Sequence, residues 1–143
     1  MKKNPLTFHS ADISIPLKER TRIKNWLQNL AKTHGYALEE LRYIFCSDDF
    51  LLEINRSSLD HDYYTDIITF DLRENTKSKK IVGEIYISVD RVRENASDFG
   101  VSFSTEMKRV LAHGILHLVG FKDKTPEQEA EMRRQEDKAL NTF

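Results

Sequence analysis

The chain has 143 residues, of which 39% are hydrophobic and 31% charged, with a net charge of −1. This length fits one domain, residues 1–143, with a core of its own, and the charge alone does not predict a polyanionic partner. The single cysteine, Cys46, excludes an intramolecular disulfide, and no segment has the roughly 20 apolar residues of a membrane span. The N-terminus, basic at Lys2 and Lys3, lacks the apolar run of a signal peptide, so we expect a cytoplasmic protein.

The spacing of apolar residues predicts the elements of the first half of the chain. Pro16 is suited to the first turn of a helix, and Gly35 to the end of one. In chain order we expect a strand at 6–8, a helix from 16 to 34, a strand at 41–45, a short helix capped by Asp48, and a polar loop at 55–64.

In the second half, the lysine-rich segment 74–80 separates two β-branched runs and predicts an antiparallel hairpin. We expect strands at 67–70 and 81–87, followed by a helix from Ser88 or Asp90 to Gly100, a helix capped by Ser104, and a helix opened by Thr125, Pro126 and Gln128. Helices gather late in the chain. The order predicts an α+β domain with a small, mixed, four-stranded sheet covered by about five helices.

Two histidines four residues apart give the strongest functional signal. His113 and His117 share one face of the predicted helix, so both imidazoles can reach one ion. Gly120 follows where the helix should stop, and the chain can then fold back to present Asp123 as a third ligand. Glu127 and His61 are reserve ligands should Asp123 point elsewhere.

Three protein ligands and an open position are typical of a catalytic zinc site, whereas a structural zinc normally has four ligands. We therefore expect a zincin-like metal helix that holds one zinc ion (Zn²⁺), although Ni²⁺, cobalt, manganese or another divalent transition metal would suit the same donors. The peptidase motif HExxH requires a glutamate after the first histidine as general base. Here that residue is Gly114, which has no side chain, so a peptidase is disfavoured.

Three segments together indicate a known family. The run HGILHLVGFKD from residue 113 resembles the signature HGxLHLxGYDH of the YbeY family, TDIITF at 65–70 resembles its TDVLSF, and GEIYIS at 83–88 resembles its GDIxIS. The final helix, with Glu131 and Met132, also follows the family. The resemblance implies a metal-dependent, single-strand-specific endoribonuclease of ribosomal RNA processing, including 16S rRNA 3′ end maturation and ribosome quality control. It also implies single-stranded rRNA and ribosomal particles as partners.

Three positions depart from the family pattern. Asp123 replaces a third histidine, which keeps a zinc ligand but makes bound water less acidic. Leu59 stands where the family commonly carries an arginine for RNA, so that task is redistributed, for example to Arg56, or weakened. Glu84 replaces the aspartate of GDIxIS. We take Glu84 and Asp66 as candidate catalytic residues, for proton transfer or support of the metal ligands.

Two other functions compete with the nuclease. A ribosome-assembly factor without catalytic activity could use the metal only to stabilise its last two helices, and the loss of the arginine at Leu59 favours it. A metallopeptidase has the histidine spacing in its favour and Gly114 against it. Cleavage of RNA, as against bound metal without cleavage, distinguishes the nuclease from the assembly factor.

Overall fold

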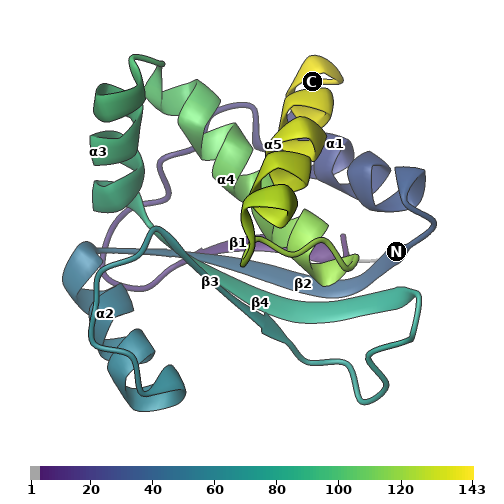
Figure 1. Cartoon of the computed structure of the whole chain (residues 1–143), viewed down its shortest axis with the longest axis horizontal. Helices are drawn as coiled ribbons and strands as arrows, with labels where there is room; N and C mark the ends of the chain where they lie inside the picture. The colour runs from purple at the N-terminus through teal and green to yellow at the C-terminus, as the bar shows by residue number, and fades with distance from the viewer. Residues whose placement is uncertain (1–3) are drawn as a thin grey trace.

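The computed structural model describes residues 4–143, so Lys2 and Lys3 lie outside the described residues. The secondary structure confirms the predicted α+β class (Figure 1). In chain order the elements are β1 (Leu6–Ser10), α1 (Arg20–Thr33), β2 (Ala37–Cys46), α2 (Asp48–Leu59), β3 (Ile67–Asp71), β4 (Lys80–Ser88), α3 (Val89–Phe99), α4 (Phe103–Leu118) and α5 (Pro126–Asn141).

The four strands form one mixed sheet in the order β1-β2-β4-β3. β1 pairs with β2 and β2 with β4 in parallel, whereas β3 and β4 pair antiparallel, with Ile67 opposite Ile87. The predicted hairpin is therefore confirmed. Because β2 and β4 are central, they are shielded on both edges, and the apolar side chains of these two strands supply most of the sheet's buried surface.

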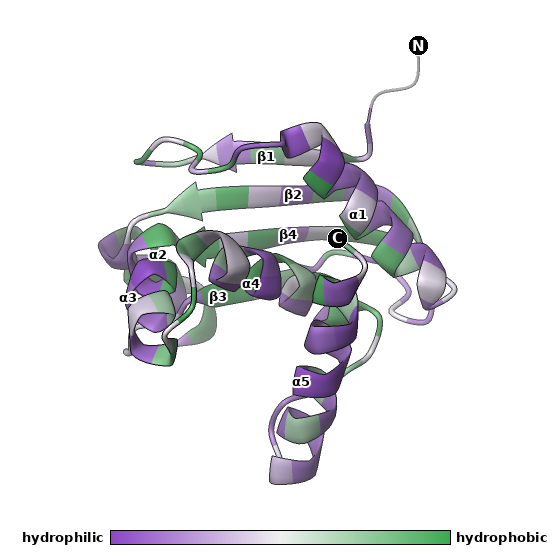
Figure 2. Ribbon diagram, turned by 90° about the horizontal axis from the view of Figure 1, so that it is seen from above, coloured by the Kyte–Doolittle hydropathy of each residue, from purple (hydrophilic) through white to green (hydrophobic). Residues whose placement is uncertain are grey.

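The two faces of the sheet are covered unequally. In Figure 1, α1, α3, α4 and α5 lie on one side and α2 on the other. Alternate residues of the central strands, such as Tyr43 and Ile85, join the large core beneath α1 and α4. A smaller cluster of Cys46, Leu51 and Ile68 lies on the α2 side. Hydrophobic colouring accordingly follows β2 and β4, while α5 is mainly hydrophilic (Figure 2).

Two contacts position α4 on the sheet. The buried hydroxyl of Tyr43 donates a hydrogen bond to the carbonyl oxygen of Leu111 at 2.6 Å, which fixes the helix against β2. One turn later Gly114 faces the sheet, where a Cβ atom would lie 2.6 Å from Cδ1 of Ile85. The absence of a side chain at this residue lets the helix approach β4 closely, and both contacts flank His113.

Several predicted boundaries were wrong. α1 begins at Arg20 because Ile13, Ile15 and Leu17 belong to a non-helical segment that packs against the core, so Pro16 starts no helix. α2 continues to Leu59 instead of giving way to a loop at residue 55: Arg56, Ser57 and Ser58 are exposed, whereas Asn55 is buried and donates a hydrogen bond to the carbonyl oxygen of Tyr63.

Two caps also differ from the prediction. Ser47 caps α2 by accepting a hydrogen bond from the backbone N–H of Phe50, and Asp48 lies in the first turn. Ser102 caps α4, two residues before the predicted cap Ser104. The predicted capping box of Thr125 and Gln128 is confirmed. Among the described residues, no helix combines the length and apolar character needed to cross a membrane.

Candidate metal centre

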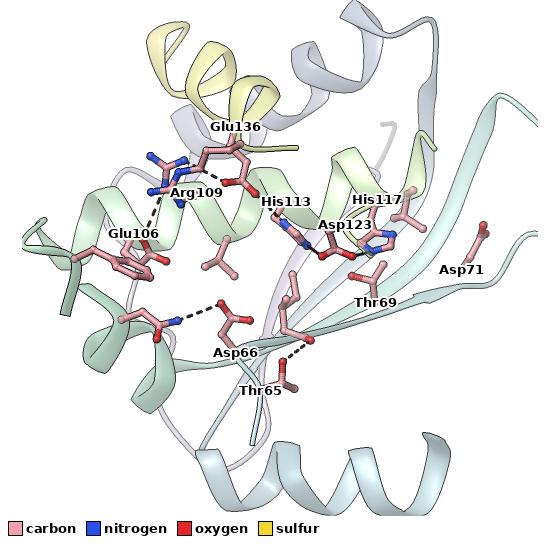
Figure 3. Close-up of a pocket in the computed structure, with 16 residues that line it drawn as sticks. Thr65, Asp66, Thr69, Asp71, Glu106, Arg109, His113, His117, Asp123 and Glu136 are labelled. Carbon is pink, nitrogen blue, oxygen red and sulfur yellow. Dashed lines mark hydrogen bonds and ion pairs between the residues drawn. The ribbon is translucent and has the colours of Figure 1, made fainter. Parts of the chain in front are cut away.

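The three predicted ligands lie together at the C-terminal end of α4. One ligand atom from each of His113, His117 and Asp123 lies within 4.8 Å of the other two. The two histidines share one face of α4, and Asp123 comes from the loop between α4 and α5 (Figure 3). Nε2 of His113 lies 3.4 Å from Oδ2 of Asp123, and Nε2 of His117 lies 3.5 Å from Oδ1.

These separations fit a shared metal ion better than direct hydrogen bonds. Hydrogen bonds from nitrogen to oxygen usually measure about 2.7–3.2 Å, shorter than both contacts. Two ligand atoms about 2.05 Å from a tetrahedral zinc ion lie about 3.4 Å apart. Two imidazole nitrogens and one carboxylate are also a donor set that zinc accepts. The residues present therefore fit a divalent transition metal.

A buried carboxylate on α5 sets the orientation of the first histidine. Nδ1 of His113 lies 2.8 Å from Oε2 of Glu136, so the N–H at Nδ1 donates and the lone pair of Nε2 faces Asp123. Arg109 donates to the other oxygen of Glu136 at 3.1 Å and pairs with Asp137 at 3.0 Å. A carboxylate behind a ligating histidine fixes the ring and raises its basicity.

The same contacts affect the proton affinity of His113. Burial lowers the pKa of His113, but the hydrogen bond and charge of Glu136, together with the charges of Asp123 and Asp66, outweigh burial and raise it overall. The surrounding carboxylates therefore favour a positive charge at this imidazole. A divalent cation would satisfy the same preference.

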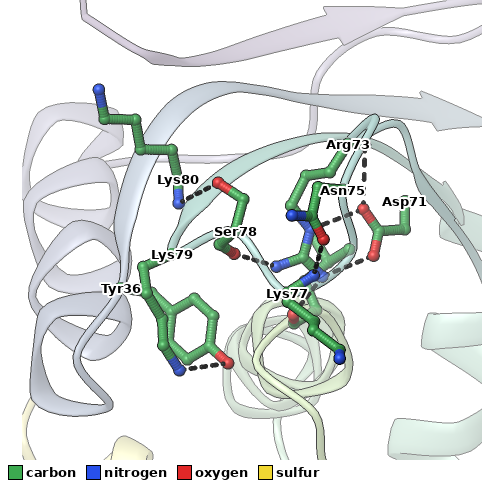
Figure 4. A network of polar contacts seen from close by, with 9 residues as sticks. Tyr36, Asp71, Arg73, Asn75, Lys77, Ser78, Lys79 and Lys80 are labelled. Carbon is green, nitrogen blue, oxygen red and sulfur yellow. Dashed lines mark hydrogen bonds and ion pairs between the residues drawn. The ribbon is translucent and has the colours of Figure 1, made fainter.

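The hairpin between β3 and β4 holds the end of α4 in place (Figure 4). Arg73 is almost fully buried and pairs with Asp71, and it also donates to the carbonyl oxygens of Ser78 at 2.8 Å and Leu118 at 3.0 Å. Leu118 is the last residue of α4, and Gly120 follows with a φ of +109°, which residues with a side chain rarely adopt. The helix therefore stops as predicted, and the chain turns toward Asp123.

A cavity of about 550 Å³ opens beside the three ligands, between α4, the start of β3, α3 and α5. Asp66 lines this cavity and accepts a hydrogen bond from Nδ2 of Asn95 at 3.3 Å. Burial raises the pKa of Asp66, although the nearby His113 and backbone hydrogen bonds act in the opposite direction. The structure thus places Asp66 in the same cavity as the ligands (Figure 3).

The structure does not support the other proposed catalytic residue, Glu84, because it lies outside the cavity. Glu84 alternates with Gly83 and Ile85, which face α4, so its side chain is on the opposite face of the sheet. There it pairs with Arg42, and it does not line the cavity. The acidic residue in the GEIYIS segment suggested catalysis, but strand alternation directs it away from the metal ligands.

The remaining RNA and ligand candidates also lie outside the cavity lining. Arg56 pairs with Asp62 on the surface, Leu59 is exposed at the end of α2, and His61 stacks against Tyr63. Glu127 lies exposed in the first turn of α5. None of these residues contributes to the metal cluster of residues 4–143.

Two buried acids were missed by the sequence analysis. Glu136 falls on the apolar stripe of α5, between Met132 and Ala139, and Glu106 precedes the buried Met107 on α4. A charged residue on the buried face of an amphipathic helix is the signal that could have revealed both. Glu106 lines the cavity, and burial raises its pKa, as does the charge of Asp66, although Arg109 opposes the shift.

Known proteins are similar to this chain along nearly its whole length. The family model described as "Endoribonuclease YbeY" matches residues 6–143. The chain belongs to the YbeY endoribonuclease family. It is 49% identical over 142 residues to "Endoribonuclease YbeY" of Cytophaga hutchinsonii, covering 99% of this chain and 97% of that protein. The protein of the same name from Flavobacterium psychrophilum is 45% identical, with 92% of each chain covered.

The fold is also similar to a solved structure. The solution structure of TM1509 from Thermotoga maritima superimposes with a TM-score of 0.65 at 28% identity, covering 95% of this chain and 91% of that one. The match covers nearly the whole of both chains, so the two proteins share this fold.

Proposed function

We propose that this chain is a metal-dependent endoribonuclease that cuts single-stranded RNA during ribosomal RNA processing. It acts in the cytoplasm as one domain on ribosomal particles, including 16S rRNA 3′ end maturation and quality control. The observation that carries the proposal is the convergence of His113, His117 and Asp123 at the spacing of zinc ligands, within a family of endoribonucleases.

The proposed ligands leave room for the substrate. Three protein donors leave at least one coordination position for solvent or a phosphate oxygen, and the adjacent cavity supplies access to it. A bound zinc ion supplies a Lewis acid there and makes water a stronger nucleophile near neutral pH. Nickel or another divalent transition metal would serve with the same donors.

Neighbouring residues hold the metal ligand His113 and the cavity carboxylate Asp66 in position. Glu136 holds His113 in the tautomer whose Nε2 faces the centre, and Arg109 holds Glu136 in turn. Asp66 is the carboxylate that we propose moves a proton, because it lies in the cavity while Glu84 does not. The amide of Asn95 orients the Asp66 side chain by donating to it.

The peptidase alternative loses support from the position of Gly114. A glutamate there would point at the sheet, where a Cβ atom alone would already lie too close to Ile85. A glutamate at this residue would therefore require Ile85 or α4 to shift. The assembly factor remains the competing function, and the exposed Leu59 at the family's arginine position is the observation that favours it.

The deciding experiment compares RNA cleavage by the wild type, His117→Ala and His9→Ala. His9 is exposed on β1, the sheet edge opposite β3, and so is a matched histidine outside the cavity. With zinc at a defined concentration, we expect the wild type and His9→Ala to cut a single-stranded rRNA fragment at the same rate. The cleavage rate of the His117→Ala variant should be at least about 100-fold lower, because this variant lacks a metal ligand. Equal rates for all three would refute the metal mechanism, and bound metal without cleavage would support the assembly factor.

A further inference from the structure

An exposed aromatic ring and an exposed arginine line the same cavity as the proposed metal centre. Phe99, the last residue of α3, is 56% exposed and lines the cavity. Arg133 of α5 also lines it, with its guanidinium 5.9 Å from the centre of the Phe99 ring. We infer that Phe99 and Arg133 form a subsite that stacks one unpaired base of the RNA, an inference that rests on the proposed function.

The charges in the cavity single out Arg133. The other cavity arginine, Arg109, pairs with Glu106, Glu136 and Asp137. Arg133 forms no ion pair with a carboxylate of the described residues 4–143, and its side chain is exposed. Its charge is therefore available to a phosphate of the RNA backbone, while the open face of Phe99 is available to a base.

Helix α5 connects this pair with the metal ligands through Glu136. Arg133 and Glu136 are three residues apart and so share one face of the helix, about 4.5 Å apart along its axis. Glu136 contacts His113 directly. A base on Phe99 would then lie in the same cavity as the phosphate at the metal.

The same ring accounts for a preference for single strands. A benzene ring can stack on any base, but only where the face of that base is uncovered. In a duplex each base is covered by its neighbours, whereas an unpaired strand can splay a base onto the ring. Phe99 would therefore select the strand by its stacking state and tolerate different base identities.

The test measures KM, kcat and RNA affinity for zinc-loaded wild type, Phe99→Ala, Phe99→Leu, Phe99→Trp and a control, Phe50→Ala. Phe50 is an exposed phenylalanine on α2, outside the cavity lining. Loss of the ring should weaken binding of a single-stranded oligoribonucleotide by roughly 5- to 150-fold in Phe99→Ala and Phe99→Leu. Phe99→Trp, which keeps an aromatic face, and Phe50→Ala should bind like the wild type, and all variants should keep the wild-type metal content.

A second arm uses RNA that lacks a single base. Substrates with one abasic nucleotide at successive positions should reveal one position whose base the wild type needs for tight binding. At that position, removal of the base should not weaken RNA binding by Phe99→Ala any further. An abasic penalty of the same size in both proteins would overturn the subsite, as would equal affinities for Phe99→Ala, Phe99→Leu and Phe50→Ala.

The two proposals fail differently. If the wild type cuts RNA and Phe99 has no effect, the subsite is wrong and the nuclease stands. If the wild type binds RNA through Phe99 without cutting it at any enzyme concentration, the nuclease is wrong and the subsite stands. Arg133→Ala adds a further readout, since the loss of one phosphate contact should lower the slope of log affinity against log salt by about 1.

Discussion

At the scale of single residues, Gly114 decides how closely the metal-bearing helix approaches the sheet. A Cβ atom at this residue would lie 2.6 Å from Cδ1 and 3.3 Å from Cγ2 of Ile85, and 3.4 Å from Cδ1 of Ile67. Ile85 is fully buried, so its side chain has little space into which it can turn. The sequence revealed that Gly114 cannot move a proton, but its packing role needed the opposing strand.

We predict that Gly114→Ala destabilises the protein despite the better helix propensity of alanine. Alanine gains about 1 kcal/mol from helix propensity, but overpacking costs about 1–3 kcal/mol. The free energy of unfolding should therefore fall by up to about 2 kcal/mol. Ile85→Val removes the atom nearest to the new methyl group. In urea unfolding, the double variant should therefore lose less free energy of unfolding than the two single variants lose together. Simple additivity of the two losses would contradict the proposed clash.

At the scale of elements, local sequence predicted where most helices and strands lie, but not where all of them begin. α3 begins and ends as expected because both signals are local: the Ser88 side chain accepts from the N–H of Arg91, and Gly100 takes a positive φ. The segment from Ile13 to Leu17 is not helical, and its apolar side chains pack against the core. Both Ser102 and Ser104 are suited to cap α4, and Ser102 is the one whose side chain accepts the capping hydrogen bond.

The cap of α4 gives a paired prediction. The hydroxyl oxygen of Ser102 accepts from the backbone N–H of Thr105 at 3.0 Å, so Ser102→Ala should lower the free energy of unfolding by about 1 kcal/mol. Ser104 is exposed within the first turn and caps nothing, so Ser104→Ala should stay within about 0.5 kcal/mol of the wild type. Urea unfolding of the two variants side by side checks this, and a larger loss at Ser104 would restore the sequence-based cap.

At the scale of the whole molecule, the site combines a local part with parts distant in sequence. His113, His117 and Asp123 lie within one helix and the following loop, so their spacing in the sequence was enough to predict their convergence. Asp66, Phe99 and Arg133 reach the cavity from three other elements, and no local pattern places them there. The error at Glu84 has the same origin, because only the register of the sheet and the position of α4 decide which face of β4 borders the cavity.

A ligand that binds only the folded chain stabilises the whole molecule, so the metal site can be tested without RNA. Zinc at about 100 times its dissociation constant should raise the free energy of unfolding by about 2.7 kcal/mol. This corresponds to a rise in Tm of roughly 5–10 °C for a chain of this size. His9→Ala should show the full rise, since His9 is distant from the ligands. Asp123→Ala should lose most of the rise, because the carboxylate that closes the site from the loop after α4 is gone. A full rise in that variant would mean that zinc binds without the loop, and the three-residue centre would be wrong even if RNA were still cut.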